Sequence, residues 1–422
     1  MDIIKELLQG VPLPKMAKIW QSFPAPEIAD VPAALREQLA KPGVINTVKP
    51  GMRVAIGVGS RGVAGIPTLT RVTVEEIRKQ GGVPFIVPAM GSHGGATAEG
   101  QREVLTSLGI TEAAVGCEIL SSMDVVEIGR LDNGLPVYID KFAYEADGIV
   151  VICRVKPHTA FRGKCESGMV KMITIGLGKQ KGAESCHAHS FKHMGENILA
   201  MSAISLARTP ILFGVASIEN AYDRIAKIIA TPAAELVETD SAMLIEAKAN
   251  MPKFLFDRFD VLIVDQVGKE ISGDGMDPNI TGRYSTPYAS GGPEIARLVV
   301  LYLTEGTHGN AVGMGTADCI TRKMFDKIDF KKTYANSLTS TVTSCIRVPM
   351  VLDDDRDAIL AAIKTCNART AADARVVRVK DTLHMGEISI SASMLPEAKA
   401  NPNIKILSPL YDLIFDDAGN LL

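Results

Sequence analysis

The sequence lacks the cysteine spacing, the charge excess and the long apolar runs that mark several classes of protein. Its seven cysteines are scattered, odd in number and never spaced as Cys-x-x-Cys, which argues against a disulfide framework and a zinc ribbon. A formal net charge of -3 gives no electrostatic case for nucleic acid. The N-terminus has no basic start followed by an apolar run, and no segment stays apolar long enough to span a bilayer. We therefore expect a cytoplasmic protein whose partners are small molecules, with no nucleic acid and no membrane among them.

The composition is that of a globular protein with more than one core. Hydrophobic residues make up 46% and charged residues 22% of the 422 residues, which excludes a disordered chain, and the length suggests two domains. We place an N-terminal domain at residues 1–252 and a C-terminal domain at residues 253–422. The tail from about residue 404 could return to either domain, and the sequence is compatible with a homo-oligomer.

Segments typical of buried strands alternate with segments typical of amphipathic helices. Residues 52–59 and 83–90 are expected to form strands on either side of a helix at residues 65–80, which is a parallel β-α-β unit. Residues 148–155 are so apolar and β-branched that we expect a central strand. The same patterns predict further helices at residues 97–109, 195–208, 232–249 and 354–365, a hairpin tip at Asp132-Asn133-Gly134, and strands at residues 259–265 and 375–381. The predicted fold class is α/β, with two α/β domains, mainly parallel sheets, and the active site in the cleft between the domains.

Two histidines follow predicted strands. His93 lies in Gly-Ser-His-Gly-Gly after residues 83–90, and His158 lies in Lys-Pro-His after residues 148–155. In open α/β sheets, ligands bind at the carboxyl ends of the strands. One strand-end histidine is as often structural as functional, and two of them together favour a functional site.

The stretch Gly57 to Gly62 fits the spacing G-x-G-x-x-G between a predicted strand and a helix, as in dinucleotide-binding loops. The next predicted strand offers no acidic residue to hold a ribose, so the match is weak. We prefer a reading in which the Arg61 guanidinium binds a substrate carboxylate through two parallel hydrogen bonds. The alternative is an ordinary surface ion pair of Arg61.

The segment from Gly168 to Gly182 places Lys171 among apolar residues and supplies glycines that let the backbone approach a ligand. Desolvation would lower the pKa of the Lys171 amine and make it reactive, whereas the alternative is a core lysine whose amine reaches solvent. His187 and His189 would share a metal if the segment were extended, with Cys186 as a further ligand. No matching carboxylate accompanies them, so zinc is a weak interpretation.

Taken in order, these motifs resemble the nickel-pincer lactate racemase family. They are Ser60-Arg61, Gly91-Ser92-His93, Pro157-His158, the run SGMVK ending at Lys171, and His187. The similarity runs from about Pro50 to about Ser190 and more loosely through the second domain. It implies a nickel-pincer nucleotide as cofactor and separate maturation enzymes that build it.

The resemblance also implies a role for each matching residue. Lys171 would carry the cofactor covalently, His187 would complete the square plane of the nickel, and Arg61 would hold the substrate carboxylate. His93 and His158 would be the general acid and base at the substrate hydroxyl. Ser60, Gly168 and Gly176 are predicted to be further cofactor-binding residues.

The sequence departs from the family pattern in two places. The gap from His158 to Lys171 is a few residues longer than in lactate racemase itself and adds Arg162, Lys164 and Glu166. These groups would suit a larger or more polar acid, such as malate or a sugar acid, although a solvated loop is an equally good interpretation. In the second domain, the corresponding region is residues 267–283, and the candidates for residues over the substrate are Lys269 and Arg283.

The predicted function is a racemase or epimerase that inverts the C2 carbinol of a 2-hydroxy acid by moving a hydride to the nickel-pincer cofactor. Two histidines suit this reaction, because a proton donor is needed on each side of the keto intermediate. The alternatives are an NAD-dependent 2-hydroxy acid dehydrogenase and a non-enzymatic hydroxy acid binding protein, with a zinc hydrolase further behind.

Overall fold

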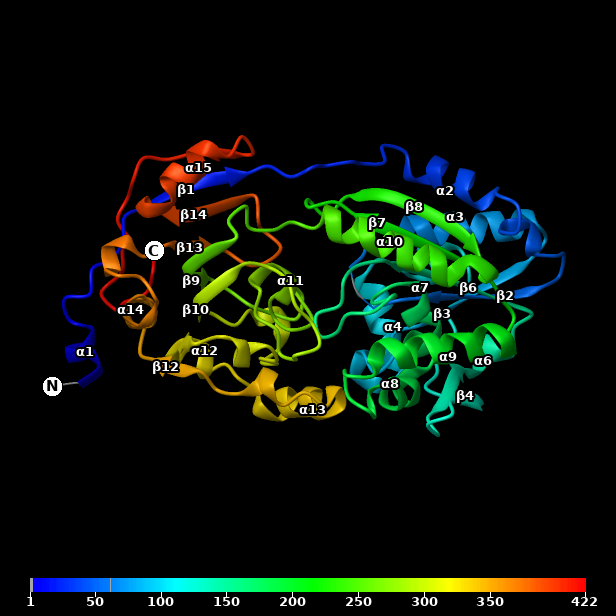
Figure 1. Cartoon of the computed structure of the whole chain (residues 1–422). Coiled ribbons are helices and arrows are strands. Elements are labelled where there is room, and N and C mark those ends of the chain that lie inside the picture. The colour runs from blue at the N-terminus through cyan, green and yellow to red at the C-terminus, as the bar shows by residue number, and fades with distance from the viewer. Residues whose placement is uncertain (1–2, 61) are drawn as a thin grey trace. The chain divides into compact units, whose positions relative to one another are not determined.

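The computed structural model describes residues 3–60 and 62–422, and the chain divides into two compact units (Figure 1). One unit, called here the N-terminal unit, consists of Pro24–Met251. The other, called the C-terminal unit, consists of Pro252–Leu422 together with Met1–Phe23. The first residues of the chain therefore belong to the same unit as the last.

The N-terminal unit is built on a five-stranded sheet of order β3-β2-β6-β7-β8. Its strands are β2 (Arg53–Val58), β3 (Val83–Pro88), β6 (Gly148–Arg154), β7 (Ile211–Glu219) and β8 (Ile225–Pro232). All neighbours are parallel except β7 and β8. The middle position of β6 confirms the prediction of a central strand, and all its residues up to Cys153 are buried, as expected for a strand covered on both faces.

Helices cover both faces of this sheet. They are α2 (Val31–Leu39), α3 (Ile66–Lys79), α4 (Ala98–Ser107), α5 (Glu112–Val115), α6 (Lys141–Tyr144), α7 (Met169–Lys171), α8 (Lys179–His187), α9 (Met194–Arg208) and α10 (Leu236–Asn250). Side chains of α2 and α3 pack on β2, β6 and β7 in one core, in which Leu35, Leu69, Ile56, Val150 and Phe213 have no exposed surface. Helix α10 packs against β7. A separate hairpin, β4 (Val125–Arg130) with β5 (Pro136–Asp140), is antiparallel and confirms the turn predicted at Asp132-Asn133-Gly134.

The C-terminal unit contains an eight-stranded sheet of order β12-β11-β10-β9-β13-β14-β1-β15. Its strands are β1 (Met16–Gln21), β9 (Arg258–Val264), β10 (Glu294–Val300), β11 (Cys319–Thr321), β12 (Met350–Leu352), β13 (Val376–Val379), β14 (Glu387–Ser391) and β15 (Ile404–Ile406). In this order, the first five strands, β12 to β13, are parallel to their neighbours within that group, and the remaining neighbouring pairs are antiparallel. Its helices are α1 (Ile3–Leu8), α11 (Pro278–Thr281), α12 (Arg322–Phe325), α13 (Phe330–Ser340), α14 (Asp355–Thr365) and α15 (Leu395–Ala400).

The two sheets confirm the predicted fold class, since strands and helices alternate in both units and parallel pairing dominates. Eight strands were not predicted from the sequence: β1, β7, β8, β10, β11, β12, β14 and β15. In the described part of the chain, no helix is both long and apolar enough to cross a bilayer.

Candidate functional site

The carboxyl ends of β2 and β3 bring two of the predicted site residues together. Ser60 follows β2, His93 follows β3, and the Ser60 hydroxyl is hydrogen-bonded to Nδ1 of the His93 ring. His93 is exposed and Ser60 is half-buried. Arg61 lies outside the described residues, so its contact with a substrate carboxylate stays a prediction.

The glycines around His93 allow its loop to pack closely on α4. Gly94 has a φ of +65°, and a Cβ there would lie 2.6 Å from the backbone nitrogen of Gln101. The Gln101 amide donates from Nε2 to the carbonyls of Gly91 at 2.8 Å and His93 at 3.2 Å. Only glycine tolerates both the positive φ and the close contact at position 94.

His158 follows the central strand β6 and is half-buried against an aromatic ring. The centroids of the His158 and Phe161 rings are 4.6 Å apart. Its Nδ1 accepts a hydrogen bond of 3.1 Å from the backbone N–H of Ala160. Because Nδ1 acts as the acceptor, the neutral imidazole carries its proton on Nε2.

Glu166, one of the three polar residues in the lengthened gap, holds the His158 loop from within the protein. Its carboxylate is buried and accepts the backbone N–H of His158 at 2.7 Å. It also pairs with Lys248 at 2.7 Å and with Arg162 at 3.3 Å. Lys164, in contrast, pairs with an exposed glutamate at the surface. Arg162, Lys164 and Glu166, which suggested extra contacts with a substrate, therefore have partners within the protein.

Lys171 ends the short helix α7, whose first turn is held by a carboxylate from α10. Asp240 accepts the backbone N–H groups of Met169 at 2.9 Å and Val170 at 3.2 Å. Burial raises the pKa of Asp240 to about 6. A Cβ at Gly168 would lie 2.0 Å from an Asp240 oxygen, so glycine there allows the carboxylate to approach. Asp240 is a functional candidate that the sequence did not predict.

A π-helical turn, Met172–Gly176, follows Lys171 and packs on the end of β3. The carbonyl of Gly176 accepts the N–H of Gly91 at 3.2 Å, and a Cβ at Gly176 would lie 2.8 Å from the carbonyl oxygen of Ala89. Turns of this kind are frequent at functional sites. Gly176 thus allows two protein segments to pack closely. Its contact with a cofactor stays a prediction.

His187 is the last residue of α8, and its tautomer is fixed. Its Nδ1 donates to the backbone carbonyl of Ala183 at 2.6 Å. Burial lowers the pKa of His187, and the positive charge of Lys171 lowers this pKa further. The imidazole is therefore neutral, with its lone pair on Nε2, which is the state that binds a metal ion.

One aromatic ring joins two of the predicted site histidines. The Phe191 centroid lies 5.2 Å from that of His187 and 5.7 Å from that of His158. The structure thus brings His158 and His187 to the same cluster, and the charge of Lys171 reaches it too. His93 lies next to Ser60 at the neighbouring strand ends.

The pair His187 and His189 lies at the end of a helix and just beyond it, so the extended segment that metal sharing would require is not formed. His189 is exposed, and the buried Cys186 points its sulfur toward Met194 at 3.2 Å. Within residues 3–60 and 62–422, no group of three His, Cys, Asp or Glu side chains is placed to hold a metal ion.

The two candidates in the C-terminal unit contact their own unit. Lys269 donates to the carbonyl of Gly273 at 2.6 Å. The Arg283 guanidinium contacts the carbonyl of Ala296 at 2.8 Å and the carboxylate of Asp318 at 3.0 Å. Their part in substrate binding stays a prediction.

The loop after β2 holds an acidic side chain near the start of α3. The Glu219 carboxylate accepts the backbone N–H of Ala64 at 2.7 Å. In a dinucleotide-binding protein, the anionic pyrophosphate binds at this end of the helix. The Ala64 N–H is therefore occupied by a carboxylate and is not available to a pyrophosphate, which argues against the dehydrogenase alternative.

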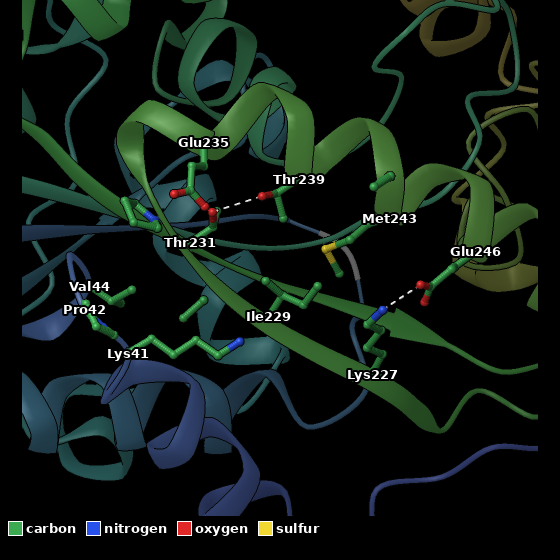
Figure 2. A pocket seen from close by; sticks show the side chains of 13 residues that line it. Lys41, Pro42, Val44, Lys227, Ile229, Thr231, Glu235, Thr239, Met243 and Glu246 are labelled. Atoms are coloured by element: carbon green, nitrogen blue, oxygen red, sulfur yellow. Dashed lines mark hydrogen bonds and ion pairs between the residues drawn. The ribbon is translucent and has the colours of Figure 1, made fainter.

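A separate cavity of about 420 Å³ lies between β8, α10 and the turn around Lys41 (Figure 2). An ion pair of 2.6 Å between Lys227 and Glu246 lies at one end of it, and a hydrogen bond of 3.0 Å between Thr231 and Thr239 lies at the other. None of the described residues of the predicted site lines this cavity. It is therefore distinct from the histidine cluster.

The segment that carries the site histidines and Lys171 is similar to a known protein family. Residues 14–198 match the family described as the lactate racemase N-terminal domain. No curated protein sequence matches the chain. The structure of the lactate racemase apoprotein from Thermoanaerobacterium thermosaccharolyticum is similar at 15% sequence identity and a TM-score of 0.47, over 96% of this chain and 94% of that chain.

Proposed function

We propose that this chain inverts the C2 carbinol of a 2-hydroxy acid with a nickel-pincer nucleotide as cofactor, because residues 14–198 match the lactate racemase N-terminal domain family, which indicates a racemase. The observation that carries the proposal is the cluster of His158, His187 and Phe191 beside Lys171, all within the matched segment. When bound, the cofactor supplies the acceptor that takes hydrogen from C2 together with its electron pair.

The residues present fit a metal that takes one ligand from the protein. Nε2 of His187 carries a lone pair, because Nδ1 donates to Ala183, and such a second partner orients metal-bound histidines. Lys171 lies close enough to His187 for its charge to lower the pKa of the imidazole. His187 would bind the nickel, and Lys171 would carry the cofactor through its amine.

His93 is suited to move a proton in either direction. A serine hydroxyl both donates and accepts hydrogen bonds, so Ser60 can support either tautomer of the His93 ring. Nε2 of His93 can therefore give a proton to the substrate oxygen or take one from it.

His158 is arranged differently from His93. The backbone N–H of Ala160 donates to its Nδ1, so in the neutral state its Nε2–H can donate a hydrogen bond to the substrate oxygen but cannot transfer its proton. To give a proton to the substrate or take one at Nε2, the ring must carry a proton on Nδ1 and give up the Ala160 bond. We expect His158 to need this rearrangement for each proton transfer, and the two histidines to have unequal roles.

The substrate is proposed to be a 2-hydroxy acid of lactate type. The lengthened gap after His158 suggested a larger acid, but Glu166 and Arg162 are bonded to each other and to that loop. Their contacts weaken the argument for malate or a sugar acid, which remain in the panel to be tested. Recognition of the substrate carboxylate by Arg61 completes the proposal.

The decisive experiment measures intact mass and nickel content on protein produced together with the cofactor maturation enzymes. The wild type should carry about one nickel and an added mass, and Lys171→Ala should lose the added mass. Lys192→Ala is the matched control, because it removes an exposed lysine from the loop after α8. Nickel without added mass would mean that Lys171 makes no covalent link.

Absence of both signals, with the maturation enzymes active on a known racemase, would refute the cofactor assignment. Loaded protein is then assayed for inversion with lactate, malate and sugar acids. His93→Ala and His158→Ala should each abolish inversion of every accepted substrate. Saturable binding of NAD to the wild type would instead favour the dehydrogenase.

A further inference from the structure

A fully buried polar cluster lies beneath the strand end that carries His93. Lys179, Asp140 and Gln101 each have 0% of their surface exposed. The Lys179 ammonium lies 2.5 Å from the carbonyl oxygen of Pro88, 3.0 Å from the Gln101 side-chain oxygen and 3.2 Å from Oδ2 of Asp140. It is therefore hydrogen-bonded to Pro88 and Gln101 and ion-paired with Asp140, which belong to three separate segments of the chain.

Burial opposes the charges of this cluster. It lowers the pKa of Lys179 and raises the pKa of Asp140, and the attraction between the two groups acts in the other direction on each. Apolar side chains of similar volume are often as stable as a buried ion pair. A gain in stability is therefore a weak explanation for the presence of this buried ion pair. Its contacts with the segments that carry the site residues explain it better.

Gln101 connects the ammonium to the His93 loop. An ammonium has donors only, so the side-chain oxygen of Gln101 must face Lys179. The amide nitrogen then points the other way, to the carbonyls of Gly91 at 2.8 Å and His93 at 3.2 Å. One cation thus fixes the orientation of the amide that holds the backbone on both sides of Ser92.

Lys179 also fixes the start of the helix that carries His187. It is the first residue of α8, and its φ of +55° is a left-handed conformation that costs a non-glycine residue about 1–2 kcal/mol. The preceding segment is held as well, since the Asp140 N–H donates to the carbonyl of Leu177 at 2.6 Å. A strained backbone of this kind persists only where its surroundings determine it.

We propose that Lys179 and Gln101 are positioning residues, which hold the His93 loop and the start of the His187 helix in one fixed arrangement through a single buried ammonium. The proposal rests on the proposed function for the roles of His93 and His187. Its structural part, the control of the loop backbone by Gln101, is independent of that function and can be measured on cofactor-free protein.

The test compares Gln101→Leu and Gln101→Glu with a control, Thr73→Val. Gln101→Leu removes the amide, and Gln101→Glu keeps an oxygen for Lys179 but has no N–H for the two carbonyls. Thr73→Val removes another fully buried side-chain donor, which bonds the Leu69 carbonyl in α3 at 2.8 Å. Hydrogen exchange is followed at the amides of Gly91 and His93.

In both Gln101 variants, these two amides should exchange at least about tenfold faster than in the wild type. The reason is that the loss of two buried hydrogen bonds lowers the free energy of local opening. Amides of β2 and β6 should change no more than they do in Thr73→Val. Nitrogen shifts of the His93 ring should report loss of its Ser60 bond. Wild-type exchange in either Gln101 variant would overturn the proposal, as would equal acceleration across the sheet.

Activity of loaded enzyme supplies a second measurement. In Gln101→Leu, kcat should fall at least tenfold with KM nearly unchanged, because the substrate still binds while the proton-transfer group is misplaced. If the wild type proves inactive on every 2-hydroxy acid while the exchange result holds, the proposed function fails and the positioning of the loop stands. Accelerated exchange combined with wild-type kcat in an active enzyme would overturn the positioning role in catalysis.

Discussion

Lys179→Met is the perturbation that tests the buried cluster most directly. Methionine keeps the length of the apolar stem but removes the ammonium, which leaves the Asp140 carboxylate buried without its cation. The oxygens of Pro88 and Gln101 also lose a donor. Removing one partner of a buried ion pair costs about 3–5 kcal/mol. For a unit of the size of Pro24–Met251, this lowers the melting temperature by roughly 6–20 °C, at about 2–4 °C per kcal/mol.

Thermal and urea unfolding, followed by circular dichroism, measure this loss. Asp140→Asn neutralises the partner while it keeps an oxygen for the Ala143 N–H, which Asp140 accepts at 2.9 Å. The double variant Lys179→Met/Asp140→Asn should therefore be more stable than Lys179→Met alone. Two results would refute a stabilising role of the ammonium. One is a decrease of less than about 1 kcal/mol in the free energy of unfolding of Lys179→Met. The other is a decrease in the double variant that equals the sum of the two single decreases.

Three further predictions concern the carboxylates and glycines of the site. Asp240→Asn should remove a pH dependence: burial raises the pKa of Asp240 to about 6, so the stability it contributes is present below about pH 4 and lost as the pH rises through about 6. Urea unfolding across this pH range should show that the free energy of unfolding of the wild type falls by about 3 kcal/mol relative to that of the variant. Glu166→Ala should cost about 2–3 kcal/mol and reduce kcat, because the His158 N–H loses its acceptor, as unfolding and turnover assays would show. Gly94→Ala should lower the stability measured by thermal unfolding by at least about 1 kcal/mol more than Gly95→Ala. Both glycines have positive φ, but a Cβ at Gly94 would lie 2.6 Å from the Gln101 nitrogen, whereas a Cβ at Gly95 would meet no described atom within 4 Å.

Local pattern was sufficient to predict the elements that lead into the site. The strands that end before Ser60, His93 and His158 are short apolar runs, and the structure forms all three. The hairpin tip was equally local, because an Asn-Gly turn is a strong signal. The ordered motifs resemble the lactate racemase family, and residues 14–198, which carry them, match the model of the lactate racemase N-terminal domain.

The residues that support the site gave no such signal, because their partners lie far away along the chain. Asp240 holds Met169 across 71 positions, and Lys179 reaches the carbonyl of Pro88 across 91. A buried lysine and an exposed lysine look the same in a sequence. The metal interpretation of His187 with His189 depended on an extended segment, and the local structure is helical instead.

The place of β1 in the C-terminal sheet has a consequence for the order in which the protein is made. Met16–Gln21 leaves the ribosome long before its partners β14 and β15. Lys18, for example, donates to Ser408 across 390 positions. Pro24–Met251 can fold while this strand waits, and the waiting segment presents unpaired backbone groups to other nascent chains. Closure of the eight-stranded sheet is then the late step of biosynthesis, and its slow, non-local pairing is where a chaperone has most to protect.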